Sequence, residues 1–166
     1  MLALAAAWPG TAAAERRGYA IGARPVWFLT GGATGGGTVA PAPHGGFVGG
    51  ELSLVRIMER RLLGIYADAY YDFAVSGTYV TLGPELGLIR RSRSFPIAIG
   101  IDGGAAFRAA NERALGVTGR VFLAMLGSLS IYCRYAYLDD GGGDHVVQVG
   151  VSLKFPLAPP FGAGAR

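Results

Sequence analysis

The segment 146–155, near the C-terminal end of the chain, alternates strictly between apolar and polar residues. Its apolar face consists of Val147, Val149, Val151, Leu153 and Phe155. Its other face is small or polar and consists of Gln148, Gly150, Ser152 and Lys154. Because successive side chains of a β-strand point to opposite faces, the segment predicts a strand with one apolar and one polar side.

The same alternation recurs upstream and predicts about eight strands between residues 18 and 155. The expected strands are 19–29, 47–58, 63–73, 78–89, 95–104, 117–125, 131–137 and 146–155. Most are close to the roughly 9 to 11 residues that a tilted membrane strand needs. The connections alternate between longer and tighter, as in consecutive hairpins, and closure removes the unpaired edges that lipid does not satisfy. The expected fold class is therefore all-β, a closed up-and-down antiparallel transmembrane β-barrel.

Composition favours a barrel over a helical membrane protein. Hydrophobic residues make up 51% of the 166, yet no segment approaches the roughly 18 unbroken apolar residues of a membrane helix. Charged residues are only 16%, below the ~25% of ordinary soluble domains. The net charge is +4, but no basic helix or aromatic-basic platform accompanies it, so we expect no nucleic-acid partner. The single cysteine, Cys133, forms no internal disulfide and is expected as a small apolar residue on the lipid-facing side.

Three segments are expected along the chain, namely 1–14, 15–155 and 156–166. Segment 1–14 is typical of the remnant of a secretory signal peptide, with a short apolar stretch and then Ala12, Ala13 and Ala14 before Glu15. It lacks a basic start, and a disordered Ala-rich tail is the alternative. Segment 15–155 is expected to form the barrel, and segment 156–166 a C-terminal tail.

Charged residues occur about once per strand on the polar faces of the expected strands. Those predicted to point into the lumen are Arg24, Glu51, Asp68, Asp72, Glu85, Asp102, Arg120, Arg134 and Lys154. The basic ones lie on the first, sixth, seventh and eighth strands and the acidic ones on the second to fifth, so closure sets a basic half of the lumen against an acidic half. Since buried charges persist when they are paired, we expect a structural network of ion pairs in the lumen.

Alternation alone does not say which face points inward, because a soluble lipocalin-like barrel alternates too. The polar face here is mainly Gly, Ala, Ser and Tyr with few charges, which suits a narrow lumen filled by side chains. Aromatic residues near the expected strand ends suit the interfacial girdles of a membrane barrel. They are Tyr19, Trp27, Phe73, Tyr79, Phe95, Phe107, Tyr137 and Phe155.

This pattern of strands, lumenal charges and girdles resembles the small eight-stranded bacterial outer-membrane barrels of the OmpA and OmpX type. The resemblance covers roughly residues 18–155 and rests on the pattern, not on a sequence motif. It implies export to the outer membrane of a Gram-negative cell, outer-membrane lipid as the surroundings, and recognition of the last strand by the barrel-assembly machinery. The residues of that C-terminal strand signal are Val147, Val149, Val151, Leu153 and Phe155. The chain departs from the pattern because segment 156–166 follows Phe155.

The residues that most resemble a metal site lie in the expected outer loops. His44 and His145 fall in two such loops, which adjoin after closure, and Asp139, Asp140 and Asp144 lie near His145. Their spacing fits no recognised metal-binding pattern, so we expect solvated loop residues and no metal.

A lipid A-modifying barrel enzyme is the catalytic alternative, and it would need a serine beside a histidine and an acid. Ser53 and Ser152 are expected in the lumen, but neither has a histidine neighbour in register. The glycines between residues 31 and 37 lack the lysine and the following helix of a phosphate-binding loop. We therefore expect neither an enzyme nor a cofactor.

The expected function is that of a small outer-membrane barrel with a structural, adhesive or loop-mediated binding role. An eight-stranded lumen is just wide enough for its own side chains, so bulk solute transport is not expected. Any specificity is expected in the loops 30–46, 109–114 and 138–145, for an extracellular ligand or partner that the sequence does not identify. The alternative from another class is a soluble secreted or periplasmic barrel that binds a small apolar ligand inside.

Overall fold

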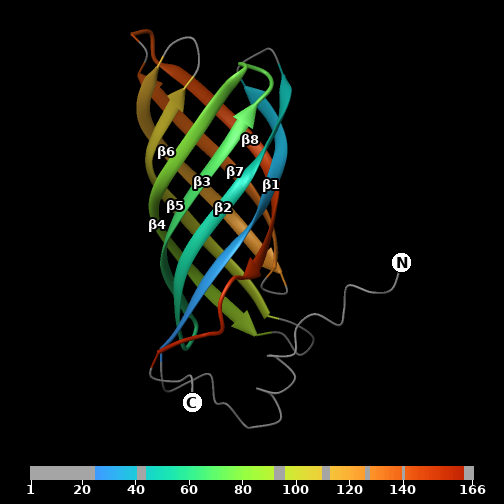
Figure 1. Ribbon diagram of the computed structural model, residues 1–166, viewed down its shortest axis with the longest axis vertical. Coiled ribbons are helices and arrows are strands. Elements are labelled where there is room, and N and C mark those ends of the chain that lie inside the picture. The colour runs from blue at the N-terminus through green and yellow to red at the C-terminus, as the bar shows by residue number, and fades with distance from the viewer. Residues whose placement is uncertain are drawn as a thin grey trace, which may run out of the picture.

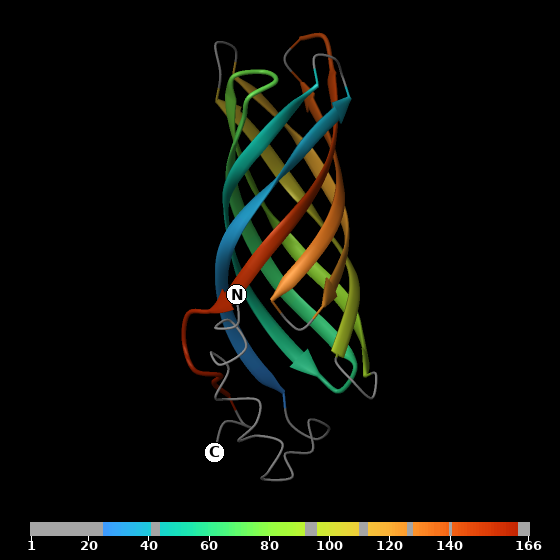
Figure 2. The same ribbon diagram turned by 90° about the vertical axis from the view of Figure 1, so that its right-hand side faces the viewer.

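The computed structural model describes residues 25–40, 44–91, 96–109, 113–125, 128–139 and 141–162. They form a closed barrel of eight antiparallel strands in which neighbours in sequence pair and β1 pairs back to β8 (Figure 1, Figure 2). The strands are β1 (Val26–Ala40), β2 (Gly45–Met58), β3 (Arg61–Asp72), β4 (Gly77–Arg91), β5 (Pro96–Ala109), β6 (Ala114–Met125), β7 (Leu129–Asp139) and β8 (Asp144–Pro156). The expected all-β, closed up-and-down antiparallel barrel is confirmed.

Several sequence expectations fall on residues outside these ranges. They concern the signal segment 1–14, Tyr19, Arg24, Phe95 and Asp140. Among the described residues, no helix has the length and apolar character needed to cross a membrane.

The two ends of the barrel differ in the strand ends and turns that form them. We call the end where β1 begins and β8 finishes the terminal end, and the opposite end the loop end (Figure 2). At the terminal end, Glu59 and Arg60 make the tight β2–β3 turn, and Glu59 has a φ of 50°. At the loop end, the connections 41–44, 73–76, 110–113 and 140–143 are all short, since the strands extend almost to the rim.

Strand β1 corrects the expectation of a Gly-rich loop over residues 30–46. Most of that segment is strand, paired with β2 from Val26 to Thr38 and with β8 from Thr30 to Ala40. Its glycines are needed for close approach: a Cβ on Gly32 would lie 1.7 Å from the carbonyl oxygen of Leu153. Glycine has no side chain to alternate, so the pattern that marks the other strands is missing from β1.

The strands place their side chains alternately in the lumen and on the outer surface. Aliphatic side chains such as Leu82, Leu88 and Ile99 lie on the outside and are well exposed, whereas Glu51 and Arg134 are buried in the lumen. This is the reverse of a soluble barrel, in which the apolar face is inside. The larger hydrophobic surface thus belongs to the exterior, and much of the interior of the barrel is polar and aromatic.

The C-terminal tail continues the sheet beyond the end of β8. The backbone N–H of Leu157 donates to the carbonyl oxygen of Leu29 at 2.9 Å, and Phe161 exchanges two backbone hydrogen bonds with Trp27, at 2.8 and 3.2 Å. The first residues of β1 would otherwise present an unpaired edge, because β8 pairs only as far as Thr30. The tail after Phe155 therefore has a structural role in covering that edge.

Two glycines of β6 provide a test of close strand approach. A Cβ on Gly116 would lie 1.8 Å from the carbonyl oxygen of Tyr137, whereas a Cβ on Gly119 would have its nearest neighbour at 3.9 Å. Gly116→Ala should therefore force β6 and β7 apart and destabilise the barrel by about 1–3 kcal/mol or more. Gly119→Ala, the matched control, should leave stability nearly unchanged. Denaturant unfolding of both variants after refolding into lipid checks this, and equal stabilities would contradict it.

Candidate functional site

A cluster of charges occupies the middle of the lumen, and we call it the lower cluster. It consists of Glu51 on β2, Glu85 on β4, Asp102 on β5, Arg120 on β6 and Lys154 on β8. Arg120 donates from Nη1 and Nη2 to both carboxylate oxygens of Glu51, at 2.8 and 2.9 Å, and from Nε to Asp102 Oδ2 at 2.7 Å. Lys154 forms an ion pair with Glu51, two strands away around the ring, and lies 3.8 Å from Oε1 of Glu85 on the opposite side of the lumen. The cluster ties five of the eight strands together.

Arg120 is the centre of the lower cluster. Its guanidinium lies 5.0 Å from the ring centroid of Tyr66 and 4.9 Å from that of Tyr132, so both rings contact the cation. Side-by-side Arg–carboxylate hydrogen bonds are among the strongest in proteins, and they offset the loss of hydration that burial imposes. All three nitrogens of the Arg120 guanidinium therefore donate to carboxylates, and these hydrogen bonds hold the lower cluster together.

A second group of polar residues, the upper cluster, lies between the lower cluster and the loop end. Arg134 on β7 forms an ion pair with Asp68 on β3, which also accepts a hydrogen bond from Thr81. Asp72 accepts hydrogen bonds from Thr38 Oγ1 at 2.5 Å and from Gln148 Nε2 at 2.9 Å. Like Arg120, Arg134 thus pairs with a carboxylate on the far side of the lumen.

Aromatic side chains fill the space around the upper cluster. Tyr70 and Tyr79 stack with ring centroids 5.0 Å apart and planes 1° from parallel, and Phe47 lies 5.4 Å from Tyr70. The Arg134 guanidinium is 4.6 Å from the centroid of Tyr70 and 5.4 Å from that of Tyr132. These residues are almost wholly buried inside the barrel.

Eight of the nine predicted lumenal charges lie inside the barrel. They are Glu51, Asp68, Asp72, Glu85, Asp102, Arg120, Arg134 and Lys154, and Arg24 lies outside the described residues. The ion pairs of Arg120 with Glu51, Arg134 with Asp68 and Lys154 with Glu51 join the basic strands to the acidic ones. Asp102 instead pairs with its direct neighbour in the ladder, Arg120.

One ion pair near the loop end was not predicted from the sequence. It places a basic residue in the expected acidic half of the lumen and an acidic residue in the expected basic half. Arg108 on β5 contacts Asp144 on β8 at 2.6 Å. Arg108 shares the inward-facing parity of Asp102, so extending that strand by four residues would have found it. Asp144 had been assigned to a loop, where no face could be predicted.

Tyr79 corrects one assignment in the predicted aromatic girdles. It is fully buried against Tyr70, because it has the same parity as the inward-facing Thr81. Of the other members, Phe73, Tyr137 and Phe155 are exposed on the outer surface, and Trp27 and Phe107 are partly exposed.

His145 and the lumenal Ser53 each contact groups other than the Ser–His pair that a catalytic site would need. His44 is exposed, and His145 Nδ1 lies 2.6 Å from the hydroxyl of Tyr135. Ser53 Oγ lies 3.1 Å from Lys154 Nζ, which already serves as the cation of the Glu51 ion pair. Over the part of the chain that the structure describes, no three His, Cys, Asp or Glu side chains are grouped to hold a metal ion.

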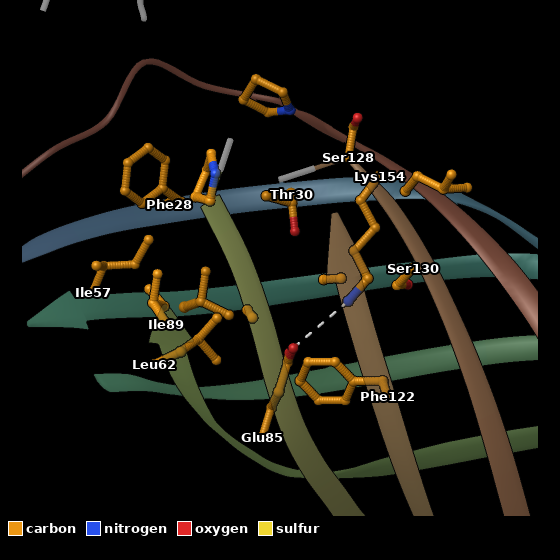
Figure 3. Close-up of a pocket in the computed structure, with 16 residues that line it drawn as sticks. Phe28, Thr30, Ile57, Leu62, Glu85, Ile89, Phe122, Ser128, Ser130 and Lys154 are labelled. Atoms are coloured by element: carbon orange, nitrogen blue, oxygen red, sulfur yellow. Dashed lines mark ion pairs between the residues drawn. The ribbon is translucent and has the colours of Figure 1, made fainter. Parts of the chain in front are cut away.

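The terminal end of the lumen contains a cavity of about 250 Å³ (Figure 3). Its walls are mainly apolar and include Phe28, Ile57, Leu62, Ile89, Ala98 and Ala124. Its polar groups include Glu85 and Lys154, whose side chains point toward each other in Figure 3. The alternation of the strands gave no sign of this cavity.

The outer surface carries an apolar belt between two polar rims. Among the described strand residues, the charged side chains that face outward are Arg56, Arg61 and Arg90 near the terminal end and Asp139 near the loop end. Between them the exposed residues are aliphatic, small or aromatic. Contiguous apolar surface on this scale is rare in soluble monomers and indicates contact with an apolar partner or solvent.

The predicted C-terminal strand signal lies on this outer belt. Val149, Val151, Leu153 and Phe155 are about half exposed, and Val147 is partly buried near the loop end. All five belong to β8 and face outward, opposite Gln148, Ser152 and Lys154 in the lumen.

Comparison with known proteins finds similar solved structures but no similar family or curated sequence. No model of a protein family matches the chain, and no curated protein sequence matches it. Among solved structures, it is similar to Neisserial surface protein A, NspA, at 9% identity over 78% of this chain and 97% of that one, with a TM-score of 0.48. It is also similar to Ail, the attachment invasion locus protein of Yersinia pestis, crystallised with the heparin analogue sucrose octasulfate, at 12% identity over 80% of this chain and 100% of that one, with a TM-score of 0.36.

The expected resemblance to small eight-stranded barrels is confirmed at the level of the fold, because the structure has eight strands in a closed sequential order. Neither similarity bears on what this chain binds.

The lower cluster gives a prediction for stability. Arg120→Met leaves the carboxylates of Glu51 and Asp102 buried with fewer partners, so the free energy of unfolding should fall by about 3–5 kcal/mol. Arg90→Met, the same substitution at an exposed position, should change it by no more than about 0.5 kcal/mol. Denaturant unfolding in lipid vesicles measures both. A loss for Arg120→Met no larger than that for Arg90→Met would show that the ion pairs do not stabilise the barrel.

Proposed function

We propose that this chain is a small outer-membrane β-barrel protein of a Gram-negative cell, embedded in lipid. The observation that carries this proposal is the inverted distribution of its residues: ion pairs inside, an apolar belt outside, and arginines at one rim. In lipid, backbone hydrogen bonds must be satisfied within the protein, and a closed ring of strands does so. Arg56 lies 5.7 Å from the ring centroid of Trp27, and such basic and aromatic pairs suit a headgroup region.

The proposed role is structural or adhesive and involves neither bulk transport nor catalysis. The upper cluster and its aromatic neighbours fill the lumen, which argues against passage of solutes. The short connections at the loop end leave little loop material, so a binding surface there would consist of strand ends and exposed rings such as Tyr135, Tyr137 and His145. Outer-membrane lipid and, through β8, the barrel-assembly machinery are the proposed partners.

The soluble-barrel alternative is disfavoured by the same distribution. A secreted barrel in water would expose its charges and bury its aliphatic residues. Here the residues exposed at mid-height include Ile65, Leu82 and Ile101, and the residues buried opposite them include Asp68 and Arg134. An apolar cavity exists, but it occupies only one end of the lumen.

Cell fractionation of the tagged full-length protein tests the proposed location. We expect recovery in the outer-membrane fraction and a shift in gel mobility between unboiled and boiled samples, because a closed barrel resists detergent until heated. Recovery in the soluble periplasmic fraction with no mobility shift would contradict the proposal.

Conductance across a planar lipid bilayer tests the closed lumen. The refolded protein should give no stable ion-conducting steps, since Arg134 and the stacked rings of Tyr70 and Tyr79 occupy the lumen. A reference porin inserted under the same conditions controls for detection. Regular conductance steps from the purified protein would show that the lumen is open.

A further inference from the structure

The terminal-end cavity combines apolar walls with a charged inner end. Ile57 and Ile89 lie near the ends of β2 and β4, whereas Glu85 lies four residues deeper along β4 than Ile89. At roughly 3.3 Å per residue, this places the carboxylate well inside the barrel. The cavity therefore runs from an apolar mouth to a polar inner end formed by Glu85, Lys154 and Ser130 (Figure 3).

The charges at the inner end do not balance. In the lower cluster, three carboxylates, those of Glu51, Glu85 and Asp102, face two cations, Arg120 and Lys154. Arg120 is engaged by Glu51 and Asp102, and Lys154 by Glu51 and Ser53, which leaves Glu85 with the longest contact, 3.8 Å. Glu85 is only 3% exposed, and its Oε2 has no hydrogen-bond partner among the described groups. A buried carboxylate oxygen without a donor is costly, so this position favours a donor supplied from outside the chain.

We propose that the terminal-end cavity binds a small amphipathic primary amine, whose ammonium group donates to Glu85 and whose hydrocarbon body lies along the apolar walls toward the mouth. The positive charge would complete the lower cluster, with three cations against three carboxylates. The cavity, at about 250 Å³, exceeds the roughly 150 Å³ that accommodates benzene in an engineered protein core. A single ring with a short aminoalkyl chain is therefore of a suitable size.

The opposite ligand charge does not fit this site. A carboxylate ligand would raise the excess of negative charge near Glu51, Glu85 and Asp102. Lys154, the only cation among the described cavity-lining residues, is already engaged by Glu51 and Ser53. An uncharged alcohol would contact the apolar walls but would make a weaker hydrogen bond to Glu85 than a charged donor.

Ligand titration of the wild-type protein in zwitterionic lipid nanodiscs tests the proposal. The probes are 2-phenylethylamine, 2-phenylethanol and 3-phenylpropanoate, which share a ring and differ in the polar group. Methyl NMR signals of Ala98 and Ala124, both in the cavity, report binding. We expect the amine to bind at least tenfold more tightly than the alcohol and the acid. Equal affinity of amine and alcohol, tighter binding of the acid, or no shift of these methyl signals at millimolar amine would overturn the proposal.

Two variants locate the binding site. Glu85→Gln should raise the Kd of the amine about tenfold or more and that of the alcohol by much less, because the amine loses an ion pair whereas the hydroxyl can still donate to the amide oxygen. Glu59→Gln, which removes an exposed carboxylate at the same end of the barrel, should leave both affinities unchanged. Ala98→Leu fills the cavity and should abolish binding of both probes. Unchanged amine binding in Glu85→Gln or in Ala98→Leu would contradict the assignment, and the wild-type comparison decides alone if a variant fails to refold.

Discussion

The pairing of β1 with β8 is the constraint on which the other features depend. It closes eight strands into a ring that leaves no long unpaired edge, as a barrel in lipid requires. The pairing is possible because glycines such as Gly32 and Gly36 let the β8 backbone approach β1 closely. Beyond the end of β8, Leu157 and Phe161 of the tail continue the backbone hydrogen bonding to β1. The glycines of β1, the closure of the ring and the C-terminal extension thus all serve to pair the edge of β1.

Closure also makes the lumen narrow, and the narrow lumen determines the arrangement of charges. Arg120 reaches Glu51 and Arg134 reaches Asp68 across the ring because an eight-stranded barrel is about as wide as two opposing side chains. In a wider barrel these groups would be solvated by water. The same geometry leaves a short unfilled space at the terminal end, where the inward residues are apolar and Glu85 has the weakest pairing.

Sequence alternation predicted the architecture and the inward or outward direction of most side chains. Parity alone was sufficient for Glu51, Asp68 and Arg134, because a strand gives only two choices of face. It predicted a first strand at 19–29 but missed the extension of β1 to Ala40, since glycine carries no alternating signal. It also placed Tyr79 on the wrong face, because nearness to a strand end outweighed parity. The partners of each charge and the terminal-end cavity depend on the stagger of strands around the ring, which a single sequence does not reveal. The Arg108–Asp144 pair was missed because β5 and β8 extend further than expected.

The direction of the apolar face can be measured at the single cysteine of the chain. Cys133 lies near the middle of β7 on the exposed outer face. A fluorophore attached to it in the unfolded state, followed by refolding into lipid vesicles, reports the surroundings of the belt. We predict strong quenching by lipids with spin labels in their acyl chains and little quenching by aqueous iodide. Quenching by iodide and not by the labelled lipids would place the apolar face away from the membrane. It would contradict a barrel whose apolar belt faces lipid.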